Sequence, residues 1–237
     1  RGIASRPGRH DLGSMQTSSP RSRWELAGLS AFALMTLGLA VRLVVEQVRR
    51  GQLTRQNGWV DVFAPAAEAF VQGRDLYSEA GGFRYPPLAA AAMVPFTWLG
   101  ELGGSIAWRW ALLLGLFLGV RACLRAGFPF ALSSRERGVF WLLLVPAVVG
   151  GTNYGQPNTL VLGGMLWATL LAWRGAPAGS AFGVLNGTLW KVYPFAHGLV
   201  LAVLRPRLIP WLALSLVVLV ALPFADRKST RLNSSHS

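Results

Sequence analysis

The chain has 237 residues, of which 52% are hydrophobic and only 14% are charged. A soluble domain usually carries about a quarter of charged residues, so this composition excludes an ordinary soluble domain and indicates an integral membrane protein. The net charge of +13 does not indicate a nucleic-acid partner, because the 23 Lys and Arg residues lie mostly at the ends of apolar runs, where they anchor helices at lipid headgroups.

The N-terminal part predicts a tail followed by one membrane anchor. Residues 1–23 are rich in Arg, Ser and Gly without periodicity, which predicts a disordered basic tail, and Met15 is a candidate start. The run 26–41 is uncharged, and snorkelling by Arg42 extends it to about one bilayer span. No small-residue cleavage site follows, so we expect this anchor to be retained.

The polar segment 46–84 carries an unusual share of the acidic residues. Asp61, Glu68, Asp75 and Glu79 are four of only ten in the chain. Pro65 and Gly73 are typical of a helix start and end, which predicts a short helix over 65–72 with Asp61 in the loop before it. At a membrane face Asp61 could act as a general base toward a hydroxyl, or it could be a solvated loop carboxylate.

Two apolar runs follow, at 85–100 and 110–120. The first opens with two prolines after Arg84, and this cation could bind a phosphate or anchor the chain at headgroups. The second lies between Arg109 and Arg121. Four Arg residues between 121 and 137 are the strongest internal signal for a cytoplasmic loop.

The stretch 138–173 has 36 uncharged residues, which as one helix would be about 54 Å long, far more than a bilayer core. It must therefore turn, and the breakers and amides of 150–158 predict where. Gln156 and Asn158 could satisfy free backbone groups at this turn. They could equally hold sugar hydroxyls, because an amide offers both donors and an acceptor.

Lys191 lies between the apolar runs 175–190 and 192–204, and a last run covers 208–225. A Lys at a bilayer centre costs about 2.5–3.5 kcal/mol, so an intramembrane Lys is a functional candidate by default. Tyr193 and Pro194 break the helix here, so Lys191 could instead reach the interface. Cys123 and His197 are expected to be packing residues.

Charge placement leaves two arrangements in the membrane. With the basic N-terminus inside, the loop 46–84 lies outside, and residues 85–124 make one net crossing if the first run enters only partly. Asp61, Gln156 and Lys191 then share one face. In the second arrangement residues 85–124 cross twice, and the turn at 150–158 lies on the side opposite Asp61.

Five features in this order resemble glycosyltransferase family 87: Asp61 in a first external loop, GRDLY (73–77), FRYPPL (83–88), GQPN (155–158) and KVYP (191–194). The resemblance covers about residues 24–225. It implies an all-α, polytopic membrane protein with the GT-C fold, of which this chain would be the N-terminal portion with short or broken membrane segments.

The resemblance also implies a function. Such a protein would transfer a sugar, expected to be mannose, from a polyprenyl phosphate to a hydroxyl of a glycan or glycolipid acceptor, with inversion and without a cofactor or metal. Asp61 would be the base, Lys191 and Arg84 would bind the donor phosphate, and four further residues would contact substrate: Gln156, Asn158, Tyr193 and Glu68. The expected place is a bacterial inner membrane, with the site on the external face.

Two departures from the family are clear in the sequence. Members are usually longer, with around ten or more membrane helices, whereas about seven apolar runs occur here. The polar tail 226–237 is unrelated to what precedes it and resembles a translated adaptor or vector junction. We therefore expect a fragment. The rival function is a transporter or flippase-like protein that binds a lipid phosphate without chemistry.

Overall fold

The computed structural model describes residues 23–53, 57–79 and 82–225. Within these residues the chain forms helices joined by short turns, and no strand occurs among them. The expected all-α class is therefore confirmed. The predicted tails 1–22 and 226–237 lie outside the described residues.

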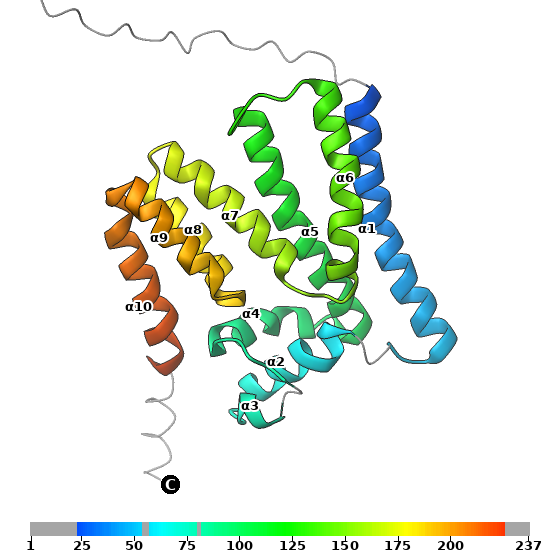
Figure 1. Ribbon diagram of the computed structural model, residues 1–237. Coiled ribbons are helices and arrows are strands. Elements are labelled where there is room, and N and C mark those ends of the chain that lie inside the picture. Colours follow the sequence, from blue (N-terminus) through cyan, green and yellow to red (C-terminus); the bar gives the residue numbers. More distant parts are fainter. Residues whose placement is uncertain (1–22, 54–56, 80–81, 226–237) are drawn as a thin grey trace, which may run out of the picture.

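Seven longer helices run side by side, and Figure 1 shows that they alternate in direction from α5 onward. The helix α1 packs on α6, α5 on α7, and α7 on α8. A short 3-10 turn, Pro206–Leu208, precedes the last helix. The bounds of the seven are α1 Arg23–Arg50, α5 Gly100–Ala126, α6 Ser134–Asn153, α7 Asn158–Trp173, α8 Pro177–Trp190, α9 Tyr193–Leu204 and α10 Ile209–Ala225.

The turns between these helices follow from local sequence. Gly127 and Gly155 adopt left-handed backbone conformations (φ 62° and 74°), which a residue without a side chain enters at no steric cost. The helix α6 starts with a capping box, in which Ser133 and Glu136 each bind the backbone N–H of the other. The predicted break within 138–173 and the break at Lys191 are both confirmed.

Four short elements lie together across one end of the long helices (Figure 1): the π-helical turn η1 Trp59–Phe63, α2 Ala64–Val71, α3 Leu76–Glu79 and α4 Pro87–Thr97. We call this region the site end of the bundle. With 11 residues α4 is only about 16 Å long, and it packs on α2. Of the segments between 85 and 124, only α5 runs the length of the bundle (Figure 1), an arrangement consistent with one net crossing of this part of the chain.

Two helices, α1 and α5, are long and apolar enough to cross a membrane. Further apolar helices, including α4, α7 and α9, are shorter. Large apolar side chains nevertheless cover the outer surface, for example Leu34, Leu143 and Val203, which are 67%, 67% and 82% exposed. Since water-soluble proteins rarely expose large continuous apolar patches, this surface suits contact with lipid.

Glycines allow two helix pairs to approach closely. A Cβ atom added to Gly28 of α1 would lie 2.7 Å from Cβ of Trp141 and against the backbone of Gly138 in α6. Gly119 of α5 meets the backbone of Gly163 in α7 in the same way. Small residues at such crossings are typical of helices that associate in membranes.

One detail of the predicted elements is wrong, and two of the apolar runs belong to longer helices. Arg109 and Arg121, which flank the run 110–120, lie inside α5. Asp61 does not lie in a loop, because the π-helical turn that contains it continues directly into α2. The helix that contains the run 26–41 continues to Arg50.

Candidate functional site

Three segments that are far apart in sequence meet at the site end. The backbone N–H of Gly58 donates to the carbonyl of Tyr154 at 2.9 Å, and the indole N–H of Trp108 donates to the carbonyl of Gly155 at 2.8 Å. The Nζ atom of Lys191 lies 5.8 Å from the centroid of the Tyr85 ring. The segments predicted to share one face of a membrane are therefore neighbours.

Aromatic rings form the common wall of these segments. The ring of Phe63 lies 5.4 Å from Trp108, 5.4 Å from Tyr85 and 6.1 Å from Trp190, measured between centroids. Trp108 and Trp190 are 5.1 Å apart. Together with Trp59 and Phe96 these residues form what we call the aromatic cluster, which joins η1, α4, α5 and the end of α8.

Asp61 lies in η1, beside the aromatic cluster, and is partly exposed. One carboxylate oxygen, Oδ2, accepts a hydrogen bond from the backbone N–H of Asn57 at 3.2 Å. The other oxygen has no hydrogen-bond partner among the described residues, so it is available to a hydroxyl. The bond to Asn57 fixes the carboxylate relative to the turn that carries it.

Lys191 follows directly after α8 and has extended backbone (φ −150°, ψ 146°). It is half-buried, and no carboxylate of the described residues lies within ion-pair distance of it. Its described neighbour is the face of Tyr85, a cation–π contact at the outer limit of about 6 Å. Burial raises the pKa of the Tyr85 phenol, so this ring stays neutral. The Lys191 cation is therefore free to meet an anion.

The remaining predicted residues lie around this region with different exposure. Arg84 is exposed and precedes Tyr85, the residue whose ring Lys191 contacts. The side chains of Gln156 and Asn158 are exposed and bind each other, with Asn158 Nδ2 donating to Gln156 Oε1 at 3.1 Å. Tyr193 is half exposed at the start of α9. Glu68 is exposed on α2, two turns beyond Asp61.

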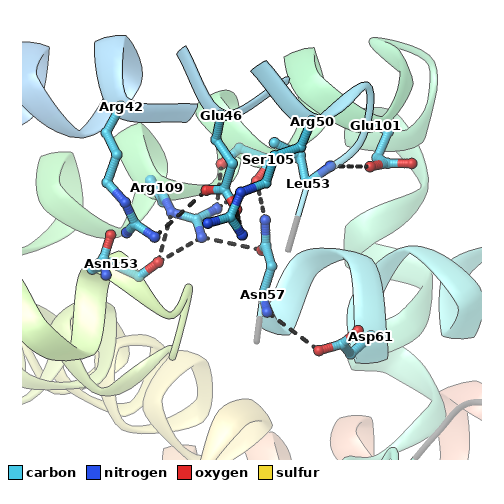
Figure 2. A network of polar contacts seen from close by, with 10 residues as sticks. All are labelled: Arg42, Glu46, Arg50, Leu53, Asn57, Asp61, Glu101, Ser105, Arg109 and Asn153. Carbon is cyan, nitrogen blue, oxygen red and sulfur yellow. Dashed lines mark hydrogen bonds and ion pairs between the residues drawn. The ribbon is translucent and has the colours of Figure 1, made fainter. Parts of the chain in front are cut away.

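Arg109 is a residue whose importance the sequence did not indicate. It is only 2% exposed, and its guanidinium makes five hydrogen bonds. Figure 2 shows that these bonds join three elements, through Asn57 beside η1, Ser105 of α5 and the carbonyl of Asn153 at the end of α6. The signal in the sequence was an Arg next to the long apolar run 110–120, since a charged residue in such a position is rare.

Two cavities lie at the opposite end of the helices from Asp61. One of about 710 Å³ is lined by the end of α5, the start of α6 and the connection between them, including Phe128 and Phe140. The other, of about 330 Å³, lies between the α7–α8 turn and Arg205. Neither cavity includes a residue predicted for the site, so cavity size does not locate the chemistry here.

Comparison with known proteins identifies the family. The model of "Glycosyltransferase family 87" matches residues 83–230, which is more than half of the chain. The match contains five of the predicted site residues, whereas Asp61 and Glu68 precede it. No curated protein and no solved structure matches the chain. The chain therefore belongs to glycosyltransferase family 87.

Proposed function

We propose that this glycosyltransferase moves a sugar, expected to be mannose, from a polyprenyl phosphate to a hydroxyl of a glycan or glycolipid, with Asp61 as general base. The observation that carries the proposal is that Asp61 and Lys191 flank one aromatic cluster at the site end. A base and a phosphate-binding cation are the two groups that this reaction requires.

The proposed step balances in protons and electron pairs. The Asp61 oxygen that has no partner among the described residues takes the acceptor proton while the acceptor oxygen forms a bond to the anomeric carbon. The bond from that carbon to the phosphate oxygen breaks, and its electron pair leaves with the lipid phosphate. Attack comes from the face opposite the leaving group, so the anomeric centre inverts. Lys191 and Arg84 stabilise the charge that grows on the phosphate.

Hydrogen-bonding capacity at the site end supports a sugar and a phosphate as ligands. The indole N–H of Trp190, next to Lys191, is buried and has no acceptor within the described part of the chain. A phosphate or sugar oxygen would supply one. Gln156, Asn158, Tyr193 and Glu68 are exposed or half exposed and present amide, phenol and carboxylate groups of the kind that bind sugar hydroxyls.

Charge distribution supports an external site in a polytopic GT-C-like membrane protein. The end opposite Asp61 carries Arg residues on successive connections, and such residues favour the cytoplasmic side. Members of this set are Arg125, Arg135, Arg137, Arg174, Arg205 and Arg207. The site end would then face the outside of a bacterial inner membrane, where a lipid-linked donor is delivered within the bilayer and needs no nucleotide.

The test offers two donors to membranes that contain the complete protein: a radiolabelled polyprenyl-phosphate mannose and a nucleotide-linked mannose. We expect label to enter a glycan or glycolipid from the lipid donor only, with an inverted anomeric centre. Transfer from the nucleotide donor would reject the proposed donor class. Movement of the lipid donor across the bilayer without any transfer would favour the rival, a flippase-like protein.

A further inference from the structure

We propose that Arg109 is a positioning residue, which fixes the turn that carries Asp61 by clamping Asn57 to α5 and to the end of α6. This inference rests on the proposed role of Asp61. It adds a residue that does not touch the substrate and that lies in a different helix from every predicted site residue.

The first observation is that the guanidinium has no spare donor. Arg109 has five N–H groups, and five hydrogen bonds leave it. Nε and Nη2 donate to the Asn153 carbonyl at 3.2 and 2.6 Å, Nη1 donates to the carbonyl and hydroxyl of Ser105 at 3.0 and 2.5 Å, and Nη2 donates to Asn57 Oδ1 at 3.1 Å. Buried and fully bonded, Arg109 cannot itself bind a donor phosphate.

The second observation concerns the two partners of Arg109 outside α5, which are Asn153 and Asn57. Asn153 is the last residue of α6, where backbone carbonyls lack intrahelical partners and a cation is favourable. Asn57 is 2% exposed and also donates from Nδ2 to the Ser105 hydroxyl at 3.1 Å. Its side chain is thus bound to two groups of α5.

The third observation connects the clamp to the proposed base. Asn57 Oδ1 accepts from the backbone N–H of Trp59, its carbonyl accepts from the N–H of Asp61, and its own N–H donates to the Asp61 carboxylate. Hydrogen bonds to Asn57 therefore hold both the backbone and the carboxylate of Asp61 in place. Figure 2 shows the sequence of bonds from Arg109 through Asn57 to Asp61.

The Arg109 guanidinium donates to no carboxylate in the hydrogen bonds described above. Glu46 of α1, which pairs with Arg42 at 3.5 Å and Arg50 at 4.0 Å, attracts Arg109 electrostatically, whereas Arg42 repels it. A neutral residue of similar length would lose this attraction and would also free the Asn57 side chain and the Asn153 carbonyl from their hydrogen bonds to Arg109.

The experiment measures the turn directly and the reaction separately. Hydrogen exchange of the amides of residues 57–63 is followed in the complete protein and in Arg109→Met, Arg109→Lys and Asn57→Ala, with Arg125→Met as a control in the exposed last turn of α5. We expect exchange at 57–63 to rise at least tenfold in Arg109→Met and Asn57→Ala, with exchange in α8 unchanged. Arg109→Lys should restore part of the protection.

Transfer kinetics supply the second readout. If Arg109 positions the base, kcat should fall at least tenfold in Arg109→Met while the donor KM changes less than twofold, and Arg109→Lys should recover part of kcat. Unchanged exchange at 57–63 in both Arg109→Met and Asn57→Ala would overturn the inference. If Arg109→Met does not fold, Arg109→Lys decides, because it keeps the charge with three donors in place of five, and unchanged exchange at 57–63 in Arg109→Lys would then overturn the inference.

The two proposals fail in different ways. Should Asp61→Asn retain full turnover, the base assignment is lost, while loosening of 57–63 in Arg109→Met would still show that the clamp exists. Should the exchange stay unchanged while Asp61→Asn is inactive, the base stands and the clamp does not.

Discussion

Replacement of Lys191 should affect the stability of the protein and its use of the lipid donor in different directions. The structure gives Lys191 no carboxylate among the described residues, only the ring of Tyr85 at 5.8 Å. Such a cation–π contact is worth about 0.5–2 kcal/mol, whereas a Lys at membrane depth costs up to about 2.5–3.5 kcal/mol. Because Lys191 is half-buried, it bears only part of that cost. Lys191→Met should therefore leave the thermal stability unchanged or slightly higher.

Catalysis should respond in the opposite direction. Losing a hydrogen bond to a charged group costs about 1.5–3 kcal/mol, which lowers kcat/KM for the lipid donor roughly 10- to 150-fold. Lys191→Arg keeps the charge without the compact geometry and should recover part of the loss. The assay is transfer at varied donor concentration, with Arg174→Met as a control at the opposite end. If Lys191→Met changes neither KM nor kcat, Lys191 is an interfacial anchor, and Arg84 is the next candidate for the phosphate site.

Three further predictions concern packing, orientation and specificity. Gly28→Ala should destabilise the protein by about 1–3 kcal/mol, because the added Cβ atom would collide with α6. The control Gly38→Ala, in the same helix, has open space around its Cβ position and should be neutral or stabilising by up to about 1 kcal/mol. Equal melting temperatures of the two variants in detergent would show that α1 and α6 do not make this contact. In a Cys123→Ser background, an impermeant thiol reagent applied outside should label single Cys residues at Gln156 and Val192 but not at Phe130, all three of which are exposed; labelling of position 130 alone would reverse the orientation. Thr152, an obvious choice from sequence, is fully buried and is unsuitable as a probe. Glu68→Gln should lower turnover far less than the roughly 10²-fold loss expected for a general base, and a loss of that size would make Glu68 the candidate base.

The sequence predicted the helical class and the helix breaks because these depend on local and additive properties. The uncharged run 138–173 is too long for one crossing, and Lys191 interrupts the next one, so both breaks can be read without the fold. The short helix within residues 85–100 was indicated by two prolines and by the short apolar run. The family was indicated by short motifs, most of which lie within the matched residues 83–230.

Tertiary contacts were not predictable from the same patterns. By composition Arg109 resembles a helix boundary, and only packing against Asn57, 52 residues away, makes it an interior residue. The π-helical turn at Asp61 likewise depends on bonds to Asn57 and on packing against the aromatic cluster. A hydropathy pattern records which residues favour lipid, but it contains no information about which polar groups meet one another.

The central claim is that the Asp61 carboxylate takes the acceptor proton, and Asp61→Asn tests it most directly. The amide is nearly isosteric, and its oxygen can still accept the hydrogen bond from the Asn57 backbone N–H, so the turn should persist. In the complete protein we expect turnover to fall at least about 100-fold while the donor KM and the level in membranes stay nearly constant. Turnover close to that of the unmodified protein would contradict the account.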